Sequence, residues 1–127
     1  LFIDLDDFKI YNDRNGHLAG DALLKALSTL FMQNFRKTDL VARYGGDEFV
    51  VILPETDHDQ AQQIAAKLRR NVSEHHFNKS DVLPNKCVSV SIGAATYPDH
   101  GSTSNELLHH ADQALYRDKE KKYQHAG

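Results

Sequence analysis

The sequence contains one cysteine, Cys87, no tryptophan and no long hydrophobic run among its 127 residues. A single cysteine excludes an internal disulfide and a cluster of thiolate metal ligands. The longest uninterrupted apolar stretch, Phe49 to Leu53, is far too short to cross a membrane, and no segment resembles a secretory leader. We therefore expect this part of the protein to lie in a reducing cytoplasm, even where the full-length protein is anchored to a membrane.

An excess of positive charge is also missing. The chain has 15 lysines and arginines against 18 acids, which gives a formal net charge of -3. Proteins that follow a nucleic-acid backbone normally carry a basic surplus, so we expect no DNA or RNA partner. The length suits one domain. Because Leu1 already lies in a strand-like segment, we expect residues 1–127 to be a single domain that is truncated at its N-terminus and follows a sensor or regulatory domain.

Hydrophobic periodicity predicts four strands and three helices. The strands are expected at residues 1–5, 41–44, 48–53 and 88–92, and the helices at about 23–36, 57–72 and 103–115. Polar loop residues are expected after the first strand, and a further loop at 78–85. Asp57 with Gln60, and Thr103 with Glu106, are the capping pairs of the last two helices. The paired glycines Gly45 and Gly46 predict a tight hairpin turn with positive φ.

The order of these elements predicts an α+β fold of the ferredoxin-like split βαβ type, a βαββαβ sandwich with an extra C-terminal helix. In this arrangement the first strand and the hairpin can lie side by side at the centre of the sheet. Asp4, in the first strand, would then meet Asp47 and Glu48 at the start of the second hairpin strand.

Three converging carboxylates predict a divalent metal site. An unpaired carboxylate at Asp4 would be costly in an apolar strand, and Asp47 and Glu48 would add repulsion. Oxygen ligands suit magnesium, which keeps waters and substrate phosphates in its shell. The alternative is that Asp4 caps a loop while Asp47 and Glu48 are solvated turn acids.

The segment after the first strand offers groups for a nucleotide. Backbone N–H groups around Asp6, Asp7 and Phe8 could face an anion, with Lys9 as a nearby positive charge. Asn12 and Asp21 carry an amide and a carboxylate that match the donor and acceptor pattern of guanine. Each of these residues could equally belong to an ordinary solvated loop.

Two stretches, "FIDLDDFKIYNDRNGHLAGD" and "RYGGDEF", closely resemble the diguanylate cyclase family named for its Gly-Gly-Asp-Glu-Phe motif. The resemblance covers nearly the whole chain and implies a fold similar to nucleotidyl cyclase and polymerase palm domains. Such enzymes join two GTP molecules into the bacterial second messenger cyclic di-GMP and release two pyrophosphates, using Mg²⁺ or Mn²⁺. They act as homodimers in which each protomer holds one GTP.

The resemblance implies specific roles for the acidic residues. Asp4 and Asp47 match the metal-binding acids, and the carbonyl of Leu5 matches a further ligand. Glu48 matches the second acid of the motif, which binds metal or activates the attacking 3′-hydroxyl. Lys9 matches a lysine near the phosphates and completes the catalytic set of Glu48, Asp47 and Lys9.

The resemblance also implies sites for substrate and product. The substrate-binding residues are Phe8, Lys9, Asn12, Asp21, Gly45, Gly46 and Lys119. Arg36 and Asp39 match the RxxD motif that binds product and inhibits the enzyme, and Lys67 lies near a second basic contact of that site. Spacing alone favours the alternative that Arg36 simply lies at a helix C-terminus, where a positive charge meets the helix dipole.

The end of the chain departs from the family pattern. Relatives usually carry Gly-Arg-Asn a few residues after the lysine that Lys119 matches, but here the three positions hold Lys122, Tyr123 and Gln124. Tyr123 cannot supply the charge of an arginine, although Lys121 or Lys122 could from one or two positions away. The alternative function is therefore a weak or inactive module that binds GTP or cyclic di-GMP as a signalling domain.

Two histidine pairs, His75 with His76 and His109 with His110, do not suit metal binding. Neighbouring residues on a helix point about 100° apart and do not easily chelate one ion. We expect all four side chains on solvated helix surfaces.

Overall fold

A computed structural model of the chain describes the backbone of residues 1–126 and the side chains of residues 1–122. The regular elements are β1 (Phe2–Leu5), α1 (Phe8–Asn15), α2 (His17–Asn34), β2 (Leu40–Arg43), β3 (Glu48–Ile52), α3 (His58–Glu74), β4 (Val90–Gly93) and α4 (Ser104–Ala126). Two short 3-10 turns, Ser80–Val82 and Pro84–Lys86, lie in the connection between α3 and β4. Within the described residues, no helix combines the length and the apolar character that crossing a bilayer requires.

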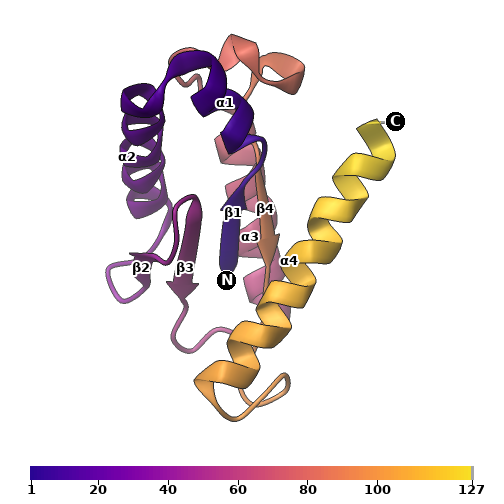
Figure 1. The fold of residues 1–127 in the computed structure, drawn as a ribbon. Helices are drawn as coiled ribbons and strands as arrows, with labels where there is room; N and C mark the ends of the chain where they lie inside the picture. Colours follow the sequence, from indigo (N-terminus) through magenta and orange to yellow (C-terminus); the bar gives the residue numbers. More distant parts are fainter. Residues whose placement is uncertain (127) are drawn as a thin grey trace.

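The four strands form one antiparallel sheet in the order β2-β3-β1-β4. This is the strand order of the split βαβ plan, and it confirms the predicted fold class. In Figure 1, α3 lies behind the sheet and α2 stands to the left of β3, whereas α4 crosses in front beside β1 and β4. The extra C-terminal helix therefore covers the sheet face that the other helices leave open.

The main hydrophobic core lies between the sheet and the helices α2 and α3. Phe31 on α2 and Phe49 on β3 are almost fully buried and meet edge to face, with ring centroids 5.0 Å apart. Burying each of these side chains stabilises the fold by about 2 kcal/mol. A smaller core on the other face joins Phe2 to Ala111 and Leu115 of α4.

Gly93 explains how closely α4 approaches the sheet. A Cβ atom at this position would lie 2.0 Å from the carbonyl oxygen of Ala111 and 2.3 Å from the amide nitrogen of Leu115. Any side chain at Gly93 would push α4 off β4, so the glycine fixes the distance between helix and strand. This contact also sets where the second half of α4 lies relative to the end of β1.

Both predicted capping pairs are confirmed. The Asp57 side chain accepts a hydrogen bond from the Gln60 amide at 2.8 Å, and the Asp57 amide donates to the Gln60 side chain at 3.0 Å. At the start of α4, the Glu106 amide donates to the Thr103 hydroxyl at 3.2 Å. Each pair satisfies N–H groups that have no partner inside the helix.

Two local predictions were wrong. Residues 8–15 form the helix α1 rather than a loop, and Gly16, with φ of 90°, joins it to α2. Gly45 and Gly46 do not adopt the positive φ expected of a tight hairpin, because Gly16 and Gly101 are the glycines with positive φ in the described chain. The reason for glycine at position 45 is a close contact described below.

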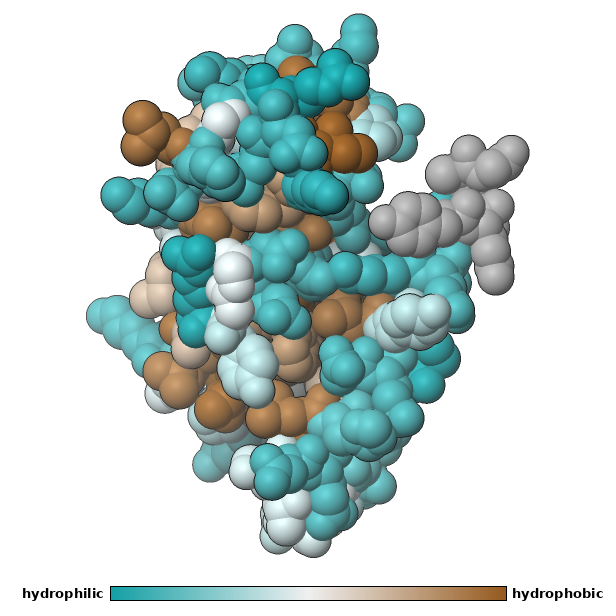
Figure 2. All heavy atoms as spheres, in the orientation of Figure 1, coloured by the Kyte–Doolittle hydropathy of each residue, from teal (hydrophilic) through white to brown (hydrophobic). Residues whose placement is uncertain are grey.

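The front face of the sheet remains partly open beside α4. Figure 2 shows apolar side chains gathered on this side of the molecule. They surround a hollow of about 540 Å³, lined in part by Phe2, Tyr44, Val50 and Leu108. The candidate functional site lies at the other end of β1, where the lining is polar.

Candidate functional site

The acidic site forms where β1 ends beside the start of β3. Asp4 lies directly opposite Glu48 in the register of the two strands, and the Leu5 amide donates to the Asp47 carbonyl at 3.2 Å. The structure thus confirms that the first strand and the hairpin bring these acids together. A Cβ atom on Gly45 would lie 2.4 Å from Oε1 of Glu48, so only glycine leaves room for this carboxylate over the turn.

Asp4 is a half-buried carboxylate whose two oxygens differ. Its side chain is 13% exposed, and Oδ2 pairs with Nζ of Lys119 from α4. The other oxygen, Oδ1, is buried and has no hydrogen-bond partner among the described residues. Burial raises the pKa of Asp4 above its ordinary value and the Asp47 carboxylate adds to the rise, whereas Lys119 opposes it.

A hollow of about 490 Å³ opens over this carboxylate. Asp4 and Glu48 line it from the sheet, and Lys119 lines it from α4. Sequence reasoning found these three residues but missed the rest of the α4 lining, which consists of Asp112, Gln113, Leu115, Tyr116 and Arg117. The missed signal is the spacing of Asp112, Tyr116 and Lys119, which places them on one side of a helix.

The donor set at this site suits a hard divalent cation. Asp4, Asp47 and Glu48 offer only oxygen atoms, and the Leu5 carbonyl is the predicted further donor. The buried unpaired Oδ1 of Asp4 is the observation that favours such a ligand. No group of three His, Cys, Asp or Glu side chains within the described residues is already assembled around a common point.

The predicted base-reading residues lie on the helix pair α1 and α2. Asn12 has a buried Oδ1 with no hydrogen-bond partner in the described part of the chain, and a Cβ atom on Gly20 would lie only 1.8 Å from it. Gly20 therefore leaves space for the Asn12 side chain, and the exposed Asp21 follows it directly in the chain. Lys9 is exposed on the first turn of α1, whereas Phe8 is half-buried and packs on the main core.

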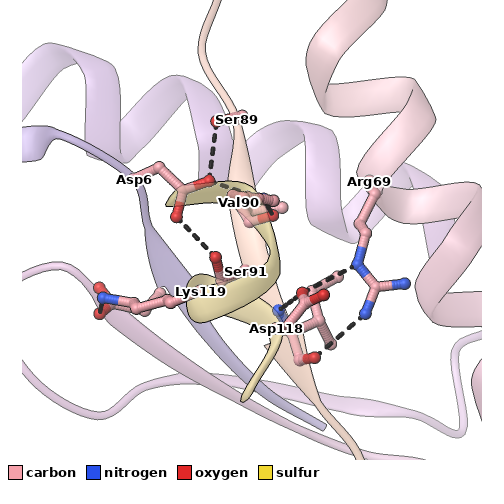
Figure 3. A network of polar contacts seen from close by, with 10 residues as sticks. Asp6, Arg69, Ser89, Val90, Ser91, Asp118 and Lys119 are labelled. Atoms are coloured by element: carbon pink, nitrogen blue, oxygen red, sulfur yellow. Dashed lines mark hydrogen bonds and ion pairs between the residues drawn. The ribbon is translucent and has the colours of Figure 1, made fainter. Parts of the chain in front are cut away.

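A polar network fixes the C-terminal half of α4 to the sheet (Figure 3). Asp118 accepts hydrogen bonds from the Ile92 amide at 2.8 Å and from Nε of Arg69 at 3.1 Å. One turn further along, Nζ of Lys122 pairs with Oδ2 of Asp6 at 2.6 Å. Lys122 thus turns toward the sheet, while Lys121 is exposed.

The family pattern also differs from this sequence at Tyr123 and Gln124. Tyr123 and Gln124 lie in α4, but their side chains are outside the described part of the structure.

The predicted product site is a local pair at an exposed corner after α2. Nη2 of Arg36 pairs with Oδ1 of Asp39 at 2.9 Å and also donates to the Pro54 carbonyl and the Thr56 hydroxyl. Burial alone would raise the pKa of Asp39, but hydrogen bonds from Arg36 lower it. Lys67 is exposed on α3, and no hydrogen bond or ion pair found among the described side chains joins it to Arg36 or Asp39.

One histidine departs from its predicted exposure. His109 is exposed as expected, but His110 is half-buried and stacks on His100 with ring centroids 4.0 Å apart. The ring of His58 meets His100 at its edge, 4.8 Å away. Parallel rings do not direct their nitrogen lone pairs at a common point, so this stack does not suit a shared metal ion.

The sequence matches a known protein family over nearly its whole length. The family profile described as "Diguanylate cyclase, GGDEF domain" matches residues 1–125. The chain is 40% identical over 121 residues to the bifunctional diguanylate cyclase/cyclic di-GMP phosphodiesterase MucR of Pseudomonas aeruginosa, covering 94% of this chain and 17% of MucR. Across the first three curated relatives it spans between 11% and 33% of their length.

Solved structures agree with this comparison. The crystal structure of the GGDEF domain of PA1120 from Pseudomonas aeruginosa matches with a TM-score of 0.83 and 40% identity, covering 94% of this chain and 74% of that one. The GGDEF domain of DgcB from Caulobacter crescentus, solved in complex with c-di-GMP, matches with a TM-score of 0.81 and 28% identity. That match covers 94% of this chain and 70% of the DgcB chain.

Proposed function

The chain belongs to the GGDEF domain family of diguanylate cyclases, and from this membership we propose that it condenses two GTP molecules into cyclic di-GMP and two pyrophosphates. The single observation that carries the proposal is the placement of Asp4. This residue faces Glu48 across the β1–β3 register, keeps one buried oxygen unpaired, and lines a polar hollow together with Lys119.

In this proposal the acids would hold Mg²⁺ or Mn²⁺ through Asp4, Asp47, Glu48 and the Leu5 carbonyl. When bound, the metal supplies positive charge at the reacting phosphate and lowers the pKa of the attacking hydroxyl. Glu48, seated over Gly45, is placed to take the proton from the 3′-hydroxyl of the substrate. Its carboxylate is half-buried, which limits competition from water.

We assign binding of the nucleotide to residues of α4 and of the helix pair α1 and α2. Lys119 from α4 and Lys9 from α1 would hold the triphosphate, because each is a point charge that can meet several phosphate oxygens. Asn12 and Asp21 would read the guanine edge, and the unpaired Oδ1 of Asn12 supports its part in this.

The reaction requires two protomers. Each 3′-hydroxyl oxygen attacks the α-phosphate of the other GTP, a new P–O bond forms, and the bond to the leaving pyrophosphate breaks. Because each protomer holds one GTP, two chains must face one another across a two-fold axis. We therefore propose a homodimer as the active form, with cyclic di-GMP inhibiting it through Arg36, Asp39 and Lys67.

The proposal is tested by fusing the chain to a dimerising coiled coil and following GTP turnover with Mg²⁺ by chromatography. We expect cyclic di-GMP from the fusion and none from a variant fused to a monomeric helix. GTP binding by titration calorimetry without any product would overturn the cyclase and favour the second candidate, a nucleotide-binding signalling module. The replacement of a basic residue by Tyr123 is the observation that favours that candidate.

A further inference from the structure

Two ion pairs connect the end of β1 with the second half of α4. Asp4 lies in β1 and Asp6 lies in the turn directly after it, and the side chains of both reach α4. Lys119 and Lys122 are three residues apart on a helix and share one face. Lys119 pairs with Asp4, and Lys122 pairs with Asp6, so the two ion pairs are neighbours.

Hydrogen bonds to β4 and the residue before it hold Asp6 in place independently of Lys122. Its backbone amide donates to the Ser89 carbonyl at 3.0 Å, which continues the pairing of β1 with β4. Its carboxylate accepts from the Ser89 hydroxyl at 2.8 Å and from the Ser91 hydroxyl at 2.7 Å (Figure 3). The Asp6 side chain is only 12% exposed, and the two serine hydroxyls donate hydrogen bonds but supply no positive charge to balance its carboxylate.

Lys122 provides that counter-charge and a second attachment. Its Nζ pairs with Oδ2 of Asp6 at 2.6 Å and also donates to the Val90 carbonyl on β4. The resemblance to relatives predicts glycine at this position, which could make neither contact. The attachment of α4 at this point is therefore a property of this chain.

Lys119 cannot serve as the anchor itself. The described contacts of its ammonium group are with Asp4, which is also the candidate metal ligand. A cation at Asp4 would weaken that ion pair, and the helix would lose this attachment at the moment when Lys119 must face a phosphate. The pair of Lys122 with Asp6 does not compete with the metal site.

We propose that Lys122 is a positioning residue, which fixes the end of α4 through Asp6 and Val90 so that Lys119 stays over the candidate metal and phosphate site. The inference rests on the proposed function for the role of Lys119. It predicts that loss of Lys122 changes the behaviour of a residue one turn away, and not merely the stability of the domain.

The test compares Lys122→Met, which keeps an aliphatic stem, with Lys122→Arg and with Lys121→Met as the matched control on the same helix. Hydrogen exchange of the amides of residues 116–122 is measured first, without nucleotide. We expect Lys122→Met to accelerate exchange about tenfold, the effect of losing one charge-assisted hydrogen bond. Lys121→Met should leave it unchanged, because that side chain is exposed.

The second readout is the affinity of the coiled-coil fusion for GTP with Mg²⁺, measured by titration calorimetry below the melting temperature. Lys122→Met should weaken binding about tenfold, and Lys122→Arg should restore most of it. Faster exchange with unchanged GTP affinity would overturn the positioning role and leave a merely structural attachment. Weaker binding with unchanged exchange would also overturn it, since Lys122 would then act on the nucleotide by charge alone.

Asp6→Asn provides an independent check and a substitute if Lys122→Met does not fold. It should accelerate exchange of the same amides, and combining it with Lys122→Met should add nothing further, because both remove one interaction. Additive effects would contradict the pairing. A wild-type fusion that binds no GTP would overturn the proposed function instead, and the exchange data alone would then decide whether Lys122 anchors the helix.

Discussion

Two ion pairs of this domain differ in how many oxygens of the carboxylate accept a hydrogen bond. Lys119 and Asp4 are 115 positions apart, and their side chains are 30% and 13% exposed. Their pairing leaves one buried oxygen of Asp4 without a partner among the described residues. Arg36 and Asp39 are three positions apart and 54% and 2% exposed. In this second pair both carboxylate oxygens accept hydrogen bonds from Arg36.

The difference indicates how each pair would respond to a ligand. At Asp4 a cation gains a buried oxygen that has no other partner, so binding relieves an unfavourable arrangement. At Arg36 a ligand must compete with bonds to Asp39, Pro54 and Thr56 that already use the guanidinium group. We therefore expect a cation to bind readily at Asp4. We expect a ligand to bind at Arg36 only at higher concentration.

Removing an acid beside Asp4 should have the largest effect. Asp47→Ala is expected to lower the rate of cyclic di-GMP formation by about 1000-fold, because loss of a metal ligand removes several kcal/mol of transition-state stabilisation. Product is measured by chromatography in the dimeric fusion, with Asp59→Ala, an exposed acid on α3, as control. A variant that keeps most of its turnover would remove Asp47 from the metal site.

The two turn glycines should separate chemistry from binding. Gly45→Ala pushes on the Glu48 carboxylate, and we expect kcat to fall about 10- to 100-fold because a catalytic group is misplaced. Gly46→Ala meets no protein atom within 4 Å, so it should instead raise KM for GTP by obstructing the nucleotide. Equal loss of kcat in both variants would show that the glycines serve only the fold of the turn.

At the second pair a smaller and opposite effect is expected. Arg36→Ala should raise product output, with about tenfold more cyclic di-GMP needed for half-inhibition, because the guanidinium fork is lost. Inhibition curves at fixed GTP measure this, and Lys37→Ala, an exposed neighbour, is the control. Unchanged sensitivity to added product would remove Arg36 from an inhibitory role.

Elements with a strong local signal could be predicted from the sequence. Short apolar runs and one alternating stretch identified all four strands, and the order of the elements predicted that Asp4 meets Asp47 and Glu48, which the strand register confirms. Capping pairs such as Asp57 with Gln60 are recognisable because both partners lie within one helical turn. The helix α1 was missed because Tyr11 is its one fully buried residue, so it carries almost no periodic apolar pattern.

Contacts that depend on how α4 crosses the sheet could not be predicted. The pairing of Lys122 with Asp6 joins residues 116 positions apart, and it follows from the close approach of α4 at Gly93. The exposure predicted for His110 failed for a similar reason, because the loop before α4 folds His100 back onto it. In both cases the helical pattern predicts on which side of the helix the residue lies, but it does not predict which distant residue contacts it.

Replacing His110 should have the smallest effect. Among the described residues no negative charge offsets the burial of His110, whereas Lys119 offsets the burial of Asp4. Burial lowers the pKa of His110 below its ordinary value of 6.5, and positive charge from His100, Arg117, His58 and His109 lowers it further. The unfolded chain therefore binds a proton more readily, so stability is full above about pH 6.5 and falls as the pH drops through that value. Between pH 7.5 and 5.5, the drop in melting temperature should be smaller by about 2 °C in His110→Asn than in the unchanged protein. His109→Asn should leave this drop unchanged. Identical melting profiles for the two variants would show that the stack of His110 on His100 costs nothing to protonate.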